Sequence, residues 1–218
     1  MQPSRGRPLV ILEVGDSLGE DLGLGMGSVL GSDPYVQVLQ KAVGFTSLAR
    51  PDYYNWPANL ETELHVYHPA AVVVMLGGND GQNFYDGSQY VTWGSALWHQ
   101  VYSERVGLMM DEAVSAGAHV LWVGMPICRD GGFSAEMAEQ NSVFAQQAAI
   151  HPGVTYYSSW SLFANSAGQY SNSLPDSSGT EQLMRDPDGV HLAGAGEVRL
   201  ASAIIPVMES AWGIDLHA

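Results

Sequence analysis

The sequence predicts an α/β fold of three layers, with helices on both faces of a five-strand parallel sheet. Two patterns carry this prediction. Short apolar, β-branched runs alternate with longer stretches that have the period of an α-helix. These runs are also continuously apolar, which is typical of parallel strands that are buried on both faces. The chain has 218 residues, and we expect a single domain that spans residues 1–218.

The predicted elements follow one another in βα order. The strands are expected at Leu9–Val14, Val36–Val43, Ala71–Leu76, His119–Gly124 and Val154–Tyr157. The best helices are Trp56–Tyr67, Trp93–Ala116, Ser134–Ile150 and Ala195–Trp212. Two long loops, Gly44–Pro57 and Ala164–Val190, interrupt this alternation of strands and helices. Loops of this length tend to be functional or mobile. Because ligands bind beyond the carboxyl ends of parallel strands, we expect the chemistry in the turns after strands.

Composition excludes several classes of protein. The 23 acidic and 8 basic residues give a net charge of -15, and the basic residues are scattered, which disfavours nucleic acid and anionic membrane surfaces as partners. No apolar run reaches the length of about 18 residues that a membrane span needs. The one cysteine, Cys128, excludes an internal disulfide and a multi-cysteine metal site. Residues 1–8 lack the apolar region of a signal peptide, so we expect a cytoplasmic protein or a chain whose signal has been removed.

The segment Gly15-Asp16-Ser17-Leu18-Gly19 directly follows the first predicted strand and opens a helix. A serine hydroxyl in this position projects from the carboxyl edge of the sheet. The helix N-terminus leaves backbone N–H groups free to stabilise an oxyanion. Ser17 is therefore a candidate nucleophile, although Asp16 or Ser17 in such a segment is equally typical of a helix cap.

Two further segments stand where a site would be built. Gly77-Gly78-Asn79-Asp80 follows the third strand, and a side-chain amide there could donate to the same oxyanion. Asp188-Gly189-Val190-His191 precedes the last helix, and its imidazole could accept the serine proton while its carboxylate holds the other ring nitrogen. Each segment alone is typical of a turn. All three in this order favour a nucleophilic site.

Together these segments resemble the SGNH hydrolases, also called GDSL esterases and lipases. Short sequence blocks characterise that family. Residues 15–18 match its first block, residues 77–80 its third and residues 188–191 its fifth, so the resemblance extends from residue 15 to residue 191. It implies a flavodoxin-like arrangement of the α/β/α layers. The flanking segments 50–57 and 123–126 are similar to a bacterial subgroup related to domains that handle O-acyl groups on cell-surface glycans.

The resemblance implies a role for each matching residue. Ser17 would be the nucleophile, His191 the general base and then the general acid, and Asp188 the residue that orients the imidazole. The backbone N–H of Ser17 and the amide of Asn79 would form part of the oxyanion hole.

The second block of the family is where this sequence departs from the pattern. That block contributes the N–H of a glycine to the oxyanion hole, and Gly44 is the only glycine between Val36 and Pro57. The pattern of the subgroup points instead to Ser47. The donor is therefore expected to be Ser47, with Gly44 as the alternative.

Residues beside these segments are candidates for substrate binding. They are Asp16, Arg50, Asp52, Trp56 and Asp80. The aromatic side chains of Tyr53, Tyr54 and Trp56 could stack on a sugar ring, although aromatic residues more often pack in a core.

Cofactor and metal sites have weak support. The glycines between Gly23 and Gly31 match no nucleotide-binding pattern. His65 and His68 share a helix face, but histidines at this spacing without a cysteine or carboxylate partner are more typical of a surface than of a metal site. We expect no cofactor and no metal.

The expected function is that of a serine esterase, which removes an acetyl or other short acyl group from an ester substrate, an acylated glycan, through an acyl-enzyme on Ser17. An O-acyltransferase that moves the acyl group to a glycan hydroxyl is the alternative, and a non-catalytic glycan-binding domain is a further one. The expected partner is a small-molecule or glycan ester. The resemblance favours the periplasm or secretion, and the oligomeric state stays open.

Overall fold

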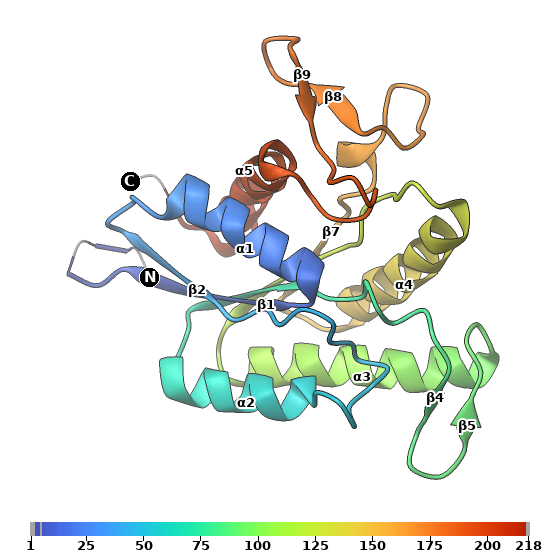
Figure 1. The fold of residues 1–218 in the computed structure, drawn as a ribbon. Coiled ribbons are helices and arrows are strands. Elements are labelled where there is room, and N and C mark those ends of the chain that lie inside the picture. Colours follow the sequence, from blue (N-terminus) through green and yellow to red (C-terminus); the bar gives the residue numbers. More distant parts are fainter. Residues whose placement is uncertain (1–2, 5, 217–218) are drawn as a thin grey trace.

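The computed structural model describes residues 3–4 and 6–216, and its centre is a five-stranded parallel sheet (Figure 1). The strand order across the sheet is β2-β1-β3-β6-β7, which confirms the predicted fold class. The strands are β1 (Leu9–Gly15), β2 (Val36–Gln40), β3 (Ala71–Met75), β6 (His119–Val123) and β7 (Val154–Tyr157). Because β1 lies between β2 and β3, the turns after these three strands meet at one edge of the sheet.

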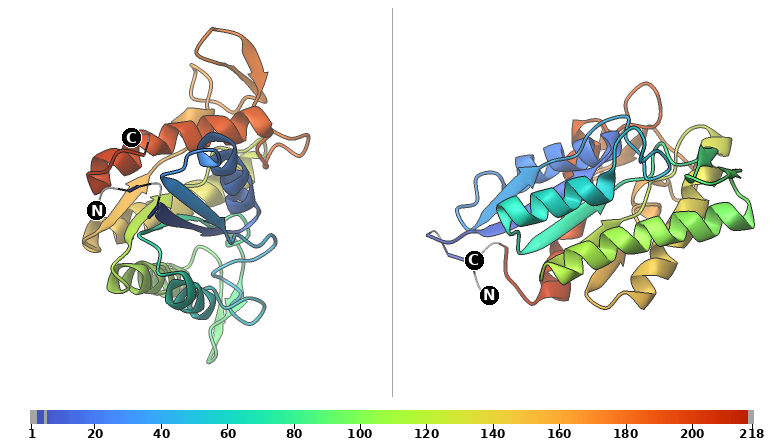
Figure 2. Two further views of the ribbon diagram at one scale, coloured as in Figure 1. Left: turned by 90° about the vertical axis from the view of Figure 1, so that its left-hand side faces the viewer. Right: turned by 90° about the horizontal axis from the view of Figure 1, so that it is seen from below.

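Different helices cover the two faces of the sheet. The helices α1 (Ser17–Leu30) and α5 (Gly194–Trp212) pack against each other on one face. The other face carries α2 (Trp56–Tyr67), α3 (Ala96–Ser115) and α4 (Gly131–Ile150) (Figure 2). Over the described residues, no helix combines the length and the apolar character that crossing a membrane would require.

Burial explains the continuous apolar pattern of the central strands. All five residues of β3 are buried, and in β1 only Val10 is partly exposed. The edge strands β2 and β7 are more accessible to solvent. The turns after β1 and β3 therefore follow strands that are closely packed in the middle of the sheet.

Local backbone chemistry moves the start of two predicted helices. Helix α3 begins at Ala96 instead of Trp93, because Gly94 has a φ of 71° and the side chain of Ser95 then caps the helix. Helix α4 begins at Gly131, three residues earlier than predicted, because the carboxylate of Asp130 accepts an N–H of the first turn.

The predicted loop Ala164–Val190 contains a small antiparallel hairpin. Its strands are β8 (Ser173–Pro175) and β9 (Glu181–Leu183), and a single 3-10 turn, Ser161–Phe163, precedes the loop. A second hairpin, with strands β4 (Phe84–Tyr85) and β5 (Tyr90–Val91), follows the turn after β3. Strands of two or three residues are too short to produce a recognisable period in the sequence.

A buried carboxyl group lies in the middle of β1. The side chain of Glu13 has no exposed surface, and one of its carboxyl oxygens lies 2.8 Å from where a Cβ atom on Gly23 of α1 would be. Burial raises the pKa of Glu13 well above its usual value of 4.5, and the backbone N–H groups of Ala42 and Lys41 offset only part of this effect.

Glu13 is expected to reduce stability as the pH rises. Between the usual and the raised pKa, the folded chain keeps a proton that the unfolded chain has released, so the free energy of unfolding falls with rising pH. We expect Glu13→Gln to be more stable relative to wild type at about pH 8 than at about pH 5. Urea unfolding of both proteins at the two pH values measures this gain, and an equal difference at both values would contradict the account.

Candidate active site

The candidate nucleophile, Ser17, is the first residue of α1 and comes two residues after the end of β1. The turn requires a glycine, because a Cβ atom on Gly15 would lie 1.9 Å from the carbonyl oxygen of Met75 in β3. The side chain of Ser17 is half-buried. Its backbone N–H lies in the first helical turn, where N–H groups have no intrahelical acceptor, so it can donate to a ligand.

Asp16 is buried and holds two turns of the site together. One carboxylate oxygen accepts the N–H of Leu18 at 2.9 Å and so caps α1. The other accepts the N–H groups of Gly77 at 2.9 Å and Gly78 at 2.6 Å, after β3. The prediction that Asp16 contacts the substrate is therefore wrong, because its side chain has no exposed surface.

A chain of hydrogen bonds joins Ser17, His191 and Asp188. The Nε2 atom of His191 lies 2.8 Å from the Oγ atom of Ser17, and the Nδ1 atom lies 2.6 Å from a carboxylate oxygen of Asp188. Asp188 also accepts the backbone N–H groups of Val190 and His191, which fixes its carboxylate in the turn before α5. Residues 174 positions apart in the sequence thus meet at the carboxyl edge of the sheet.

The carboxylate determines the proton positions in this chain. An ionised carboxylate only accepts hydrogen bonds, so the neutral ring of His191 donates from Nδ1 to Asp188 and leaves the Nε2 lone pair for the hydroxyl of Ser17. Burial lowers the pKa of His191, but the hydrogen bond to Asp188 and the charges of Asp21, Asp188 and Asp16 raise it more, and the net shift is upward. Burial likewise raises the pKa of Asp188, whereas its hydrogen bonds with His191 and Val190 give a net lowering.

Asp21 is a further carboxylate of the site that the sequence analysis missed. It lies on α1 one turn after Ser17, and its carboxylate accepts the N–H of Leu192 at 2.8 Å. This bond ties the segment that carries His191 to the helix that carries Ser17. Burial raises the pKa of Asp21 to about 6, and the positive charge of His191 offsets part of that shift. The spacing of four residues from Ser17, which places both on one helix face, could have identified Asp21.

The geometry after β2 distinguishes the two candidate oxyanion donors. The N–H of Gly44 donates to a carboxylate oxygen of Glu20 at 3.0 Å, so it is already engaged. Among the described residues the N–H of Ser47 has no acceptor. The amide of Asn79 donates to the carbonyl oxygen of Thr46 at 3.0 Å, which places Asn79 beside Ser47 and leaves its second N–H available.

Two other predicted substrate contacts are wrong because their side chains are buried. Trp56 is 2% exposed, and its indole N–H donates to the hydroxyl of Thr46 at 3.0 Å. Asp80 has no exposed surface and accepts the N–H of Ala49 at 2.8 Å and the hydroxyl of Tyr102 at 2.9 Å. Burial raises the pKa of Asp80 to about 7. Both residues hold the segment that contains Ser47.

The remaining predicted contacts are on the surface. Arg50 and Asp52 form an exposed ion pair at 2.8 Å, and their role in substrate binding stays a prediction. Tyr53 is 65% exposed, whereas the ring of Tyr54 packs on Trp56 with centroids 4.8 Å apart.

Two arginines that the sequence analysis did not single out support the turn with Asp188 and His191. Arg129 donates to the carbonyl oxygen of Pro187 at 2.8 Å, and its own backbone N–H donates to the carbonyl oxygen of Gly189. Arg185 is buried and donates to the carbonyl oxygens of Val190 and Ile127. Isolated arginines give no signal in a sequence, because their backbone acceptors lie far away along the chain.

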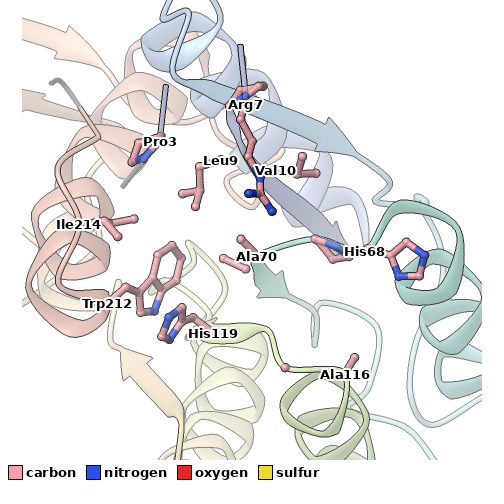
Figure 3. Close-up of a pocket in the computed structure, with 14 residues that line it drawn as sticks. Pro3, Arg7, Leu9, Val10, His68, Ala70, Ala116, His119, Trp212 and Ile214 are labelled. Carbon is pink, nitrogen blue, oxygen red and sulfur yellow. The ribbon is translucent and has the colours of Figure 1, made fainter. Parts of the chain in front are cut away.

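A cavity of about 500 Å³ lies at the opposite edge of the sheet (Figure 3). Its lining includes the first residues of β1, β3 and β6, so it faces away from Ser17. None of the predicted site residues lines it. The rings of His65 and His68 lie 5.9 Å apart, and within the described part of the chain no group of three or more metal-binding side chains comes together.

Comparisons with known proteins agree with this fold. A GDSL-like lipase from Bacteroides thetaiotaomicron is similar, with a TM-score of 0.64 and 13% identity over 97% of this chain and 92% of that chain. An acetylxylan esterase from Geobacillus stearothermophilus, solved as a catalytic mutant, gives a TM-score of 0.62 and 15% identity over 96% of both chains. An alpha/beta hydrolase enzyme from the metagenome of Lake Arreo, Spain, gives a TM-score of 0.65 and 14% identity over 94% of both chains.

The comparison with curated proteins found no match. A family model described as a protein of unknown function (DUF459) matches residues 10–207. The solved structures confirm the fold that the resemblance to SGNH hydrolases implies. The chain therefore has the SGNH hydrolase fold and belongs to the DUF459 family.

Proposed function

We propose that this chain is a serine esterase that removes a short acyl group, such as acetyl, from an acylated glycan. The observation that carries the proposal is the hydrogen-bonded chain from Ser17 through His191 to Asp188. The fold it shares with esterases and lipases supports ester hydrolysis in general. One of these neighbours is an acetylxylan esterase, which supports an acetylated sugar as the substrate.

The geometry suits acyl transfer in two steps. His191 takes the proton of the Ser17 hydroxyl through Nε2 while the Oγ atom bonds to the ester carbonyl carbon. The negative charge that develops on the carbonyl oxygen is stabilised by the N–H groups of Ser17 and Ser47 and by the amide of Asn79.

The tetrahedral intermediate then loses its alcohol. His191 gives its proton to the leaving oxygen, and the acyl group stays on Ser17 as an ester. A water molecule attacks that ester with His191 as base again, which releases the acid and restores the hydroxyl. Asp188 stabilises the imidazolium in both steps.

The experiment that tests this function is hydrolysis of p-nitrophenyl acetate and of an acetylated xylo-oligosaccharide by the purified protein. We expect release of p-nitrophenol and of acetate. Mass spectrometry with an added acceptor sugar separates hydrolysis from acyl transfer, because a transferase would yield an acetylated acceptor. Failure to cleave both esters would contradict ester hydrolysis, and cleavage of p-nitrophenyl acetate alone would contradict only the glycan substrate.

The loss of activity on acidification is expected to begin at a higher pH than an ordinary histidine would give. His191 must be neutral to accept the serine proton, and its pKa lies above the usual 6.5. We therefore expect kcat/KM for p-nitrophenyl acetate to fall on acidification with a midpoint above 6.5. In Asp21→Asn the midpoint should move down, because the charge of Asp21 helps to raise the pKa of His191. The absence of any fall would contradict the role of His191 as general base, and a midpoint below 6.5 in the wild type would contradict the upward shift of its pKa.

A further inference from the structure

Phe45 combines two unfavourable features in the segment after β2. Its backbone has a φ of 63°, in the left-handed region that bulky residues avoid. Its side chain is 85% exposed, so the ring gains almost nothing from burial. Stability alone would favour glycine or asparagine here, and strained residues of this kind concentrate at functional sites.

The neighbours of Phe45 hold it in a fixed turn. The N–H of Val43 donates to the carbonyl oxygen of Gly15 at 2.8 Å. The hydroxyl of Thr46 donates to the carbonyl oxygen of Val43 at 2.6 Å. The N–H of Gly44 donates to Glu20 on α1 at 3.0 Å. Hydrogen bonds therefore fix the backbone before and after Phe45, whose ring is exposed.

The same turn places Phe45 at the rim of the candidate active site. On one side, Gly44 is bonded to Glu20, which lies one helical turn after Ser17. On the other side, the carbonyl oxygen of Thr46 accepts the amide of Asn79 at 3.0 Å. The backbone of Phe45 thus lies between a residue bonded to the helix of the candidate nucleophile and a residue bonded to a candidate oxyanion donor.

We propose that Phe45 is the stacking platform of a subsite for a sugar ring of the substrate. This inference rests on the proposed esterase function and deepens it. A sugar presents a face of C–H groups that packs on an aromatic ring, and its hydroxyl groups need polar partners around that ring. The exposed carboxylate of Glu20 is bonded to the N–H of Gly44 beside Phe45, and the exposed Arg50–Asp52 pair lies in the same segment. A long acyl chain would instead need a groove with several apolar side chains.

A rigid ring is well suited to this task. Binding to a fixed aromatic side chain costs little conformational entropy, because the side chain has two rotatable bonds and its backbone is already ordered. The strain at Phe45 is then the consequence of holding the ring outward at this point.

The test compares kcat/KM of wild type and Phe45→Ala on acetylated xylo-oligosaccharide, p-nitrophenyl acetate and p-nitrophenyl octanoate. We expect the ratio of kcat/KM for the oligosaccharide to that for the aryl acetate to fall about tenfold, mainly through KM. Phe45→Trp should restore the ratio. The control Ile150→Ala removes another exposed apolar side chain, at the end of α4, and should leave the ratio unchanged. Melting curves check that each variant is folded.

Four results would overturn the subsite. An equal loss on the oligosaccharide and the aryl acetate would mean that Phe45 acts through the oxyanion segment. A loss confined to the octanoate would mean that the ring contacts the acyl chain. A wild type that cleaves the aryl acetate but not the oligosaccharide would refute the sugar subsite and leave the esterase intact, whereas failure on every ester would refute both.

Discussion

Replacing Ser17 by alanine is expected to lower kcat for p-nitrophenyl acetate by about 10⁴- to 10⁶-fold. The hydroxyl oxygen is the atom that would form the acyl-enzyme, and it is the group that Nε2 of His191 contacts at 2.8 Å. Without it, the oxyanion donors and the binding surface leave only a small residual rate. Steady-state kinetics at saturating substrate measures the loss.

Ser28 offers a matched control on the same helix. It is exposed and lies on α1, so Ser28→Ala removes a hydroxyl from the same element without touching the site. We expect its kcat to stay within about twofold of wild type. If Ser17→Ala retained activity close to that of Ser28→Ala, Ser17 would not be the nucleophile.

Asp188→Asn is expected to lower kcat by about 10³- to 10⁴-fold. The amide nitrogen of asparagine can donate a hydrogen bond to Nδ1 of His191, which would favour the ring tautomer that carries its proton on Nε2. That tautomer cannot accept the proton of Ser17. The variant also removes the negative charge that stabilises the imidazolium.

The neighbouring Asp186 provides the control for Asp188. It is exposed in the same turn, and its backbone N–H donates to the carbonyl oxygen of His191. Asp186→Asn keeps that backbone bond and should change kcat by less than about twofold. Similar kinetics of Asp186→Asn and Asp188→Asn would show that no specific carboxylate orients His191.

Much of the fold could be predicted because buried parallel strands have a strong pattern. The five strands of the sheet lie where the continuous apolar runs are, and α2 has the predicted limits. Helix starts were less accurate, because the cap at Asp130 and the positive φ of Gly94 depend on local backbone geometry. The hairpins after β3 and before α5 have strands too short to produce a pattern.

The site could be predicted only in part. The residues of the three motif segments follow strands or precede helices, and this placement brings Ser17, Asp188 and His191 together. The sequence does not show which way an adjacent side chain faces, so Asp16 and Trp56 were assigned to the substrate although both are buried.

Other residues gave no pattern at all. Arg185 and Arg129 bind carbonyl oxygens that are distant in the sequence, and the exposure of Phe45 depends on the turn that carries it. Such contacts follow from the tertiary structure and are visible only once the turns after the strands are placed next to one another.

The most direct test of the central claim is covalent labelling with a fluorophosphonate, which forms a stable ester with an activated serine. The account predicts one adduct per chain, located on Ser17 by peptide mass spectrometry, and loss of esterase activity in proportion to labelling. The Ser17→Ala protein should take up none. Labelling on another residue, or full activity in a completely labelled protein, would contradict the assignment of Ser17 as the nucleophile.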